Sequence, residues 1–529
     1  MTYPKSIDFL IVGAGAAGLY MANELVQKGF SVMIAEQRVR PTTHSKSIGI
    51  HPPSLRLLEN LGLLDQFLKS GVSVTEGLAF VRQKSLATKS GFTRPVGSMK
   101  LGSGEGSDRI LVVPQYKTEA ILSENLPEGV LFRGLKLIDF SDEAERGTSK
   151  AQDDSVFPVE AIFEVNPEAA MWQSIKTEKS SSLAVDMSAG EANSENKKVF
   201  ESSDNSISTG NSANPDNTSS IGNSGNNQLK QKIRIPENSD DPKIESPSER
   251  KSETIRIKCR YLIGADGMHS HVRSLAKIDW NLSQYPWPFC MGDFPDNTDF
   301  GSKPAIFLTS DGLTESFPLP GNLRRWVINL SPDDPIFDDN SLGGKWHSVG
   351  KTVNNATKRR SDATISVEEL CRRIKSRTDI SLQPESHEMF SSFSIYRGEA
   401  ATLAKGNVFL VGDSAHVISP IGGQGMNLGW MNIHDLVRLF SEPDSIRKPG
   451  VRATEIGDEL HEQKLIRLRE VRKKYSAEAL ARARKFAVRA EFNTKMGLPG
   501  RPVWLMRILV RMLLSAPLRG FVSRRFTMQ

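Results

Sequence analysis

The sequence has few of the features that mark secreted, zinc-binding or membrane-spanning proteins. Its 529 residues include only three cysteines, Cys259, Cys290 and Cys371. Because these are far apart and odd in number, they form neither a disulfide framework nor a zinc-ligand spacing, and a reducing compartment is the simpler interpretation. Without a zinc-ligand spacing we expect no metal site. No run of roughly 18 uncharged apolar residues occurs, so we expect no membrane-spanning helix.

Neither the charge balance nor the N-terminus points to a specialised destination. The net charge of +6, from 68 basic and 62 acidic residues, is too small to indicate nucleic acid as a partner. The chain enters an apolar segment at Ile7 without the basic region, long apolar stretch and small-residue cleavage site of a signal peptide. We therefore expect a cytoplasmic protein that binds no nucleic acid. The oligomeric state stays open.

One central segment is poor in apolar residues. Residues 168–252 are dominated by Ser, Asn, Glu, Lys and Asp, and cannot bury enough apolar surface to offset the entropy lost on ordering. Strand-like segments flank it at 158–166 and 253–263, so we predict a disordered loop inserted at the tip of a hairpin. A solvated tether is the simplest interpretation, and a phosphorylated or partner-binding segment is the alternative.

Elsewhere the hydrophobic pattern predicts an ordinary globular chain. It indicates a helix over residues 53–69, a Gly/Ser-rich loop over 97–107, and a strand entering a helix over 110–126. Residues 280–400 mix short strands with proline- and glycine-rich turns, which is typical of a mostly β domain. From about residue 456 the pattern is mainly helical and rich in arginine.

A glycine-rich turn near the N-terminus has the context of a dinucleotide-binding fingerprint. It joins a buried strand over residues 7–12 to a helix over 16–28, and a second strand follows over 31–35. The glycines permit a tight turn and close approach of backbone to a pyrophosphate, while the helix N-terminus offers N–H groups to phosphates. An acid ends the second strand, where a ribose would bind. The residues assigned here to cofactor binding are Gly13, Gly15, Ala16, Ala17, Gly18, Glu36 and Gln37.

Two further turns follow strands later in the chain. The first contains Asp266 and Gly267, which can bring a carboxylate and backbone amides to a phosphate or ribityl group; an ordinary Asp-Gly turn is the alternative. The second has an aspartate suited to a sugar hydroxyl, then a glycine-dense helix start. Its amides suit a reduced flavin, which is negatively charged near N1 and O2. The residues assigned there are Gly412, Asp413, Pro420, Gly422, Gly423, Gly425, Met426 and Asn427.

In this order and spacing, the three motifs resemble the p-hydroxybenzoate-hydroxylase-like family of FAD-dependent aromatic monooxygenases, over nearly all of the chain except residues 168–252. The resemblance implies that the first motif binds the ADP half of FAD. The second would serve FAD and the nicotinamide nucleotide, and the third the ribityl chain and flavin. It also places Gln115 against FAD. Lys46 stands where the family usually has an arginine beside the flavin and nucleotide, and it keeps the charge but loses the bidentate fork.

Three smaller points concern residues around the third motif. Arg397 matches an arginine that the family often has before this motif. Asn432 stands where an aspartate is more usual, and Ser414 replaces a common alanine, which we take as a minor change.

The resemblance implies an α/β fold with a Rossmann-like FAD-binding domain of the glutathione-reductase type, a mostly β substrate domain and C-terminal helices. The domain ranges are 1–167, 253–279 and 401–455 for FAD binding, 168–252 for the insertion, 280–400 for the substrate domain, and 456–529 for the helices. The implied activity is hydroxylation of an aromatic or quinol-type, lipophilic substrate. NADPH or NADH would reduce the flavin, and O2 would then form a C4a-hydroperoxide.

No catalytic base can be placed from the sequence. His51, His269 and His416 are candidates by residue type alone, and His44 and His51 lie in a loop expected to face the flavin. For His44, His51 and His416 we favour packing or bracing. The alternative functions are a flavin-dependent halogenase, a prenyl-chain reductase of the same FAD fold, and a non-catalytic FAD-bound scaffold.

A basic amphipathic helix is predicted near the C-terminus. Within residues 502–514, Arg507 and Arg511 share a face opposite apolar residues. Such a helix can lie on a membrane surface as a peripheral contact. The alternative, which we favour, is a terminal helix that packs its apolar face on the FAD domain.

Overall fold

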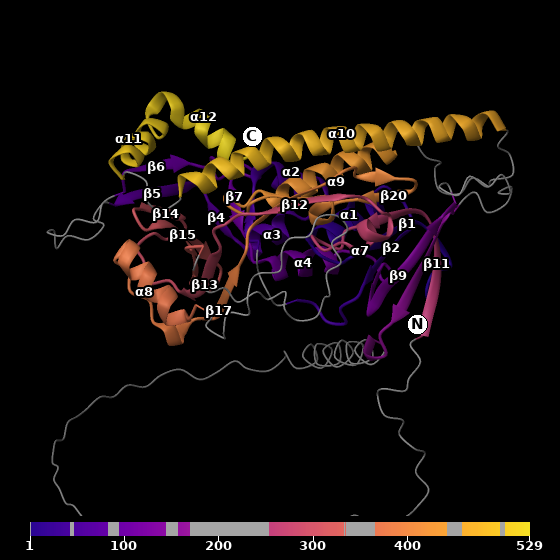
Figure 1. The fold of residues 1–529 in the computed structure, drawn as a ribbon, viewed down its shortest axis with the longest axis horizontal. Helices are drawn as coiled ribbons and strands as arrows, with labels where there is room; N and C mark the ends of the chain where they lie inside the picture. Colours follow the sequence, from indigo (N-terminus) through magenta and orange to yellow (C-terminus); the bar gives the residue numbers. More distant parts are fainter. Residues whose placement is uncertain are drawn as a thin grey trace, which may run out of the picture. The chain divides into compact units, whose positions relative to one another are not determined.

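The computed structural model describes most of the chain (Figure 1). The predicted disordered segment lies outside the described residues from position 170 to 252, and so do His44 and Lys46. The described residues are 2–42, 47–82, 95–143, 157–169, 253–332, 334, 365–441, 458–497 and 503–529.

Buried apolar strands from three parts of the chain form an eight-stranded sheet, whose main path runs in the order β19-β20-β11-β1-β2-β8, with β10 and β9 beyond β11. The pairs β1–β2, β1–β11, β11–β20 and β2–β8 are parallel, so the carboxyl ends of these strands meet at one edge, where nucleotides bind in such sheets. The strands are β1 (Ser6–Val12), β2 (Val32–Glu36), β8 (Leu131–Arg133), β9 (Leu135–Asp142), β10 (Val159–Val165), β11 (Glu253–Gly264), β19 (Ala404–Lys405) and β20 (Val408–Leu410).

The strands β10 and β11 are the arms of the predicted hairpin. They pair antiparallel from Val159 with Cys259 to Val165 with Glu253. The segment that we expected to be inserted at a hairpin tip therefore leaves from the end of this pair.

A second, seven-stranded sheet has the order β17-β13-β16-β15-β14-β5-β6. Its two outer strands β5 and β6 come from residues 76–100, which the sequence assigned to the FAD-binding part, and they join through the parallel pair β5–β14. The strands are β5 (Glu76–Arg82), β6 (Gly97–Lys100), β13 (Phe289–Pro295), β14 (Ala305–Thr309), β15 (Gly312–Leu319), β16 (Leu323–Asn329) and β17 (Met389–Phe393).

The two faces of this second sheet are covered differently. Leu370 and Ile374 of helix α8 (Val367–Thr378) pack against Trp326 on one face. On the other face, Met506 and Val510 of helix α11 (Val503–Leu513) pack in a cluster with Val81, Leu308, Leu313 and Val327. This alternation follows from the two-residue period of a strand, which points successive side chains to opposite faces.

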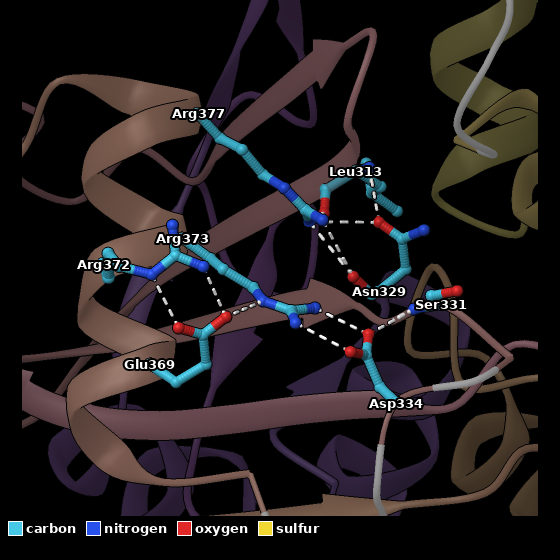
Figure 2. Close-up of polar contacts among 8 residues, drawn as sticks. All are labelled: Leu313, Asn329, Ser331, Asp334, Glu369, Arg372, Arg373 and Arg377. Carbon is cyan, nitrogen blue, oxygen red and sulfur yellow. Dashed lines mark hydrogen bonds and ion pairs between the residues drawn. The ribbon is translucent and has the colours of Figure 1, made fainter.

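Arginines attach α8 to the ends of the inner strands β15 and β16, as Figure 2 shows. Buried Arg377 donates hydrogen bonds to the backbone oxygens of Leu313 at 2.9 Å and Asn329 at 3.1 Å. Arg373 pairs with Asp334 at 2.7 Å and with Glu369 at 2.6 Å. Since Asn329 also accepts the Leu313 N–H at 2.7 Å, Arg377 holds the tight β14–β15 turn in place.

The remaining elements include two small sheets, β3-β7-β4 and β12-β18-β21. They also include the helices around the first sheet and the C-terminal helices that Figure 1 draws from orange to yellow. The strands are β3 (Gly49–Ile50), β4 (Val72–Val74), β7 (Ile110–Val112), β12 (Trp280–Gln284), β18 (Tyr396–Ala400) and β21 (His416–Val417). The helices are α1 (Ala16–Gln27), α2 (Pro52–Asn60), α3 (Leu64–Ser70), α4 (Gln115–Glu124), α7 (His271–Leu275), α9 (Gly425–Ser441), α10 (Asp458–Met496) and α12 (Ala516–Phe526).

Two local predictions are wrong. The single helix expected over 53–69 is two helices, because Gly62 adopts a φ of +75° between them. The loop expected over 97–107 begins as strand β6, which pairs with β5. The larger prediction is confirmed: a Rossmann-like α/β domain, a mostly β second part and C-terminal helices. Within the described ranges, no helix is long and apolar enough to cross a membrane.

Candidate functional site

The first motif is a turn that only glycine can make at two of its positions. Gly13 has a φ of +108°, and a Cβ there would lie 2.5 Å from the backbone oxygen of Ala265. A Cβ on Gly18 would lie 2.0 Å from the oxygen of Gly13. A Cβ on Gly15 would instead meet nothing nearer than Glu119 Oε1, at 3.9 Å. The space in front of the N-terminus of helix α1 is therefore open. No side chain caps this end, and its first turn contains no acid. Such a helix N-terminus suits a phosphate.

Glu36 lies buried at the end of β2, beside this turn. Its Oε2 accepts the Ala14 N–H at 2.8 Å, and its Oε1 accepts Arg38 Nε at 2.9 Å. Burial opposes ionisation of this carboxyl, but the bonds from Arg38 and Ala14 hold its pKa below the usual value. The carboxylate is thus charged next to the turn, while neighbouring Gln37 is exposed.

Gln115 is the first residue of α4, and its amide bonds one residue of another segment and one residue of its own helix. Its Oε1 accepts the Ser47 N–H at 3.3 Å, and its Nε2 donates to Glu119 Oε1 at 2.8 Å. Burial raises the pKa of Glu119, whose Oε1 is also the nearest atom to Gly15. The amide of Gln115 therefore lies close to the open space in front of α1.

The second motif packs directly on the first, because Ala265 is the residue that Gly13 approaches. Asp266 Oδ2 accepts the backbone N–H groups of His271 at 2.7 Å and Val272 at 3.0 Å. Asp266 Oδ1 is buried and has no hydrogen-bond partner among the described residues. A buried acceptor without a donor is costly, and a hydroxyl group of a bound molecule would satisfy it.

The third motif packs on the first helix. Gly412 has a φ of +62°, and a Cβ there would lie 2.8 Å from the Cβ of Ala17. Asp413 is exposed beside it, as is Pro420. The three motifs therefore meet at the carboxyl edge of the parallel sheet, although the first and third are about 400 residues apart in the sequence.

Arg273 and Ser414 join the second motif to the third. Buried Arg273 donates to the backbone oxygens of Ser414 and Met268, both at 2.8 Å, and stacks over Trp280. The Ser414 hydroxyl bonds the oxygen of Gly264 at 2.6 Å, a contact that alanine cannot make. The change expected to be minor at Ser414 therefore has a structural role. Arg273 follows the second motif directly in the chain, but its bond to the third motif was not predicted.

The glycine run of the third motif is braced by His51 and Asn427. His51 Nε2 lies 3.0 Å from the oxygen of Gly422, and Asn427 Nδ2 donates to the oxygens of Gly423 and Gly49 at 2.8 and 2.9 Å. The His51 N–H donates to Asn427 Oδ1 at 2.8 Å. Burial lowers the pKa of His51 to about 4, so its ring is neutral near pH 7 and donates through Nε2. His51 is thus a brace of the glycine loop.

The other histidine and polar candidates lie elsewhere. His416 is buried, and its Nε2 lies 2.8 Å from the amide nitrogen of Asn432, whose oxygen accepts Arg482 at 2.7 Å. Burial lowers the pKa of His416 to about 4. Arg397 forms an ion pair with Glu491 at 3.4 Å, and His269 is exposed.

The sheet face that carries α11 continues to the glycine loop. Ile421, the residue before Gly422, belongs to the same apolar cluster as Leu313, Val327 and Met506. Two acids lie in the register of this face, and one of them, Glu315 of β15, stands opposite Ile306 of β14 and Val327 of β16. Because cross-strand partners point to the same side, its carboxyl group belongs to this apolar face.

Glu315 is 6% exposed, and no described residue gives its carboxyl group a hydrogen bond or an ion pair. Burial raises its pKa to about 7. The second acid of this face, Asp293, is paired: Arg325 donates to its two carboxylate oxygens at 2.7 and 2.8 Å. Sequence reasoning missed Glu315, since nothing near it in the chain marks it as buried.

Comparison with known proteins gives one family and partial relatives. A family model described as an FAD binding domain matches residues 6–146, 226–305 and 325–444. The uncharacterized aromatic compound monooxygenase YhjG of Bacillus subtilis is 28% identical over 167 residues, 31% of this chain and 31% of that protein. A rifampicin monooxygenase of Rhodococcus hoagii is 29% identical over 148 residues, 28% of each chain. The chain thus spans less than a third of the length of both relatives.

A solved structure has a similar fold. The p-nitrophenol 4-monooxygenase PnpA of Pseudomonas putida has a TM-score of 0.58 at 12% identity, covering 99% of this chain and 98% of that chain. This likeness concerns the fold alone. The family match agrees with the resemblance inferred from the three glycine motifs.

Proposed function

Because the chain belongs to the FAD binding domain family, we propose that it is an FAD-dependent monooxygenase that hydroxylates an aromatic or quinol-type substrate. In this reaction NADPH or NADH provides a hydride, and a proton is consumed. One atom of O2 enters the substrate and the other leaves as water. The observation that carries the proposal is the meeting of three glycine turns at one sheet edge, with a buried acid, Glu315, that no described residue pairs with on the apolar face beyond them.

The residues at the sheet edge fit FAD. The open N-terminus of α1 at Gly15 would hold the pyrophosphate, and Glu36 a ribose. The unpaired Asp266 Oδ1 and the exposed Asp413 would accept hydroxyl groups. The loop braced by His51 would present its N–H groups to the ring edge, and we keep Lys46 as a proposed neighbour of the flavin. Bound FAD would supply hydride uptake and O2 activation, which no amino-acid side chain supplies.

The apolar face of the seven-stranded sheet would hold the substrate, and Glu315 would be its acid–base group. A buried carboxyl with no partner destabilises the fold, so its presence on this face is consistent with a ligand that pairs with it. A pKa of about 7 lets the group accept a proton from a phenol hydroxyl near neutral pH. The surrounding aliphatic side chains would keep water from the site.

The test is a reduction assay on the purified protein. Its visible spectrum is recorded with NADPH and then with NADH, first anaerobically and then in air, in the presence of a panel of phenols and quinols. We expect one nucleotide to bleach the flavin, one phenol to accelerate the bleaching, and a hydroxylated product in air. Bound flavin that neither nucleotide reduces, with or without the panel, would overturn the proposal in favour of a halogenase served by a separate reductase, or of a scaffold.

Glu315→Gln separates the two parts of the proposal. If Glu315 meets the substrate, the variant keeps its FAD and its slow reduction by nucleotide alone, but loses most of the product formation. It also loses the pH dependence of hydroxylation near pH 7. A variant that hydroxylates with the original pH profile would remove Glu315 from the mechanism and leave the monooxygenase proposal intact.

A further inference from the structure

Helix α11 is apolar on two sides, and only one of them is used inside the protein. Met506 and Val510 pack on the seven-stranded sheet. Four large side chains at helical spacing point away from it: Trp504, Leu505, Ile508 and Met512 are 60, 50, 56 and 51% exposed. The prediction that this helix packs on the FAD domain is therefore corrected: α11 packs on β5 and β14 of the seven-stranded sheet. That packing accounts for one apolar side of α11 and not for the other.

The neighbouring helix also exposes large apolar side chains. Helix α12, which contacts α11, exposes Leu518 at 38% and Phe521 at 54%. Figure 1 shows the two helices side by side at one end of the second sheet, over β6. Single exposed apolar residues are common on proteins, but a group of them on two adjacent helices marks an interaction surface. We call these six residues the terminal apolar surface: Trp504, Leu505, Ile508, Met512, Leu518 and Phe521.

The charge around this surface has one sign. Residues 492–529 contain no Asp or Glu and seven Lys or Arg residues. On α11 and α12, Arg507, Arg511, Arg519 and Arg524 are exposed, and within the described part of the chain no carboxylate pairs with them. Arg525 lies over the ring of Phe521 at 5.0 Å. The partner must therefore tolerate a cationic rim and an apolar centre at once.

We propose that the terminal apolar surface docks on the face of a lipid bilayer that contains anionic lipids. Apolar side chains on a helix lying flat enter the boundary between headgroups and acyl chains, tryptophan favours that depth, and arginine keeps its charge among the phosphates. A second copy of this chain is a poor partner, because it would bring cationic rims together. The opposite side of α11 covers β5 and β14, so docking would bring the bilayer to the substrate sheet.

The test is sedimentation of the FAD-loaded, full-length protein with vesicles. One set is phosphatidylcholine alone, and the other also contains phosphatidylglycerol. We expect binding to the anionic vesicles that weakens as salt rises, and little binding to the neutral ones. Ile508→Glu should weaken that binding by about tenfold or more, since it puts a carboxylate at the centre of the surface. Arg511→Gln should weaken it less, and Arg511→Lys should preserve it.

The matched control is Leu282→Glu, an apolar residue exposed at 40% on β12, away from α11 and α12, which should bind as the unmodified protein does. Thermal unfolding and the flavin spectrum of each variant show that the fold persists. Absence of binding to anionic vesicles, or an equal effect of Ile508→Glu and Leu282→Glu, overturns the proposal. So does a concentration-dependent dimer that Ile508→Glu abolishes. Because no turnover is measured, failure here leaves the proposed enzymatic activity untouched.

Discussion

At the carboxyl ends of β1, β11 and β20 the packing depends on close contacts made by glycines, to which Arg273 and Ser414 add side-chain bonds. The seven-stranded sheet is instead held to α8 by side chains. In the first region, Gly13 packs so closely on Ala265, and Gly412 on Ala17, that neither position has space for a side chain. In the second, buried arginines bind backbone oxygens, and one buried acid has no described partner. A site built from glycines can be recognised in the sequence, because it needs glycine at fixed spacings. A site built from side chains is harder to recognise, because it depends on the register between strands that are distant in the sequence.

The comparison predicts its largest effect at Gly18. Gly18→Ala should destabilise the protein by at least about 3 kcal/mol, because the new Cβ meets the Gly13 oxygen at 2.0 Å and that backbone cannot move freely. Thermal unfolding and the FAD content of the purified protein measure the change.

The control in the same turn is Gly15→Ala, whose Cβ meets no atom closer than 3.9 Å. It should leave the apoprotein stable and weaken FAD binding alone. Equal loss of stability in both variants would contradict the distinction between Gly18, which packs on backbone, and Gly15, which faces the bound cofactor.

The next effect concerns the arginines of α8 in Figure 2. Arg377→Met should destabilise the protein by about 2 to 3 kcal/mol, since it leaves the oxygens of Leu313 and Asn329 buried with fewer donors. Arg372→Met, five residues earlier and 68% exposed at its ion pair with Glu369, should change the stability far less, because water screens that pair. Chemical denaturation of both variants gives the difference, and similar losses would contradict a side-chain-held sheet.

Glu315→Gln should stabilise the protein above neutral pH. The native pKa of about 7 lies above that of an unfolded glutamate, so the unfolded chain releases its proton first and stability falls as pH rises from about 4.5 to 7. The variant lacks this loss and should gain about 1 to 2 kcal/mol at alkaline pH, and much less near the bottom of that range. Unfolding midpoints across this range test it. A gain independent of pH would show that the carboxyl is not buried unpaired.

The buried histidines should produce the smallest effect, and with the opposite sign. His51 and His416 have native pKa values of about 4, so the unfolded chain takes up protons first as pH falls through about 6.5. Stability should decline between those values, by about 1 kcal/mol per histidine near the middle of the window. His51→Gln should show a shallower decline than the unmodified protein. An unchanged slope would mean that the His51 ring is not neutral in the fold.

The difference between glycine turns and side-chain contacts also explains how much of the structure could be predicted from the sequence. The β1–α1–β2 unit was predicted to within a residue or two, because its glycines and apolar runs are local signals. Strand β6 was missed because its Gly/Ser-rich sequence becomes a strand only through pairing with β5, and the break at Gly62 was missed because the leucine pattern continues across it. Glu315 was invisible because its neighbours Ile306 and Val327 come from other strands. The assignment of Lys46 and of the insertion over 168–252 stays a prediction.

The parallel pairing of β1 with β11, which joins Ser6 to Lys258, also has a consequence for synthesis on the ribosome. At roughly 5 to 20 residues per second, β11 emerges on the order of ten to fifty seconds after β1. During that interval β1 and β2 have one unpaired edge, a surface on which nascent chains aggregate or recruit chaperones. We expect the yield of folded protein in a heterologous host to depend strongly on chaperone supply and growth temperature, even if the folded protein itself is stable.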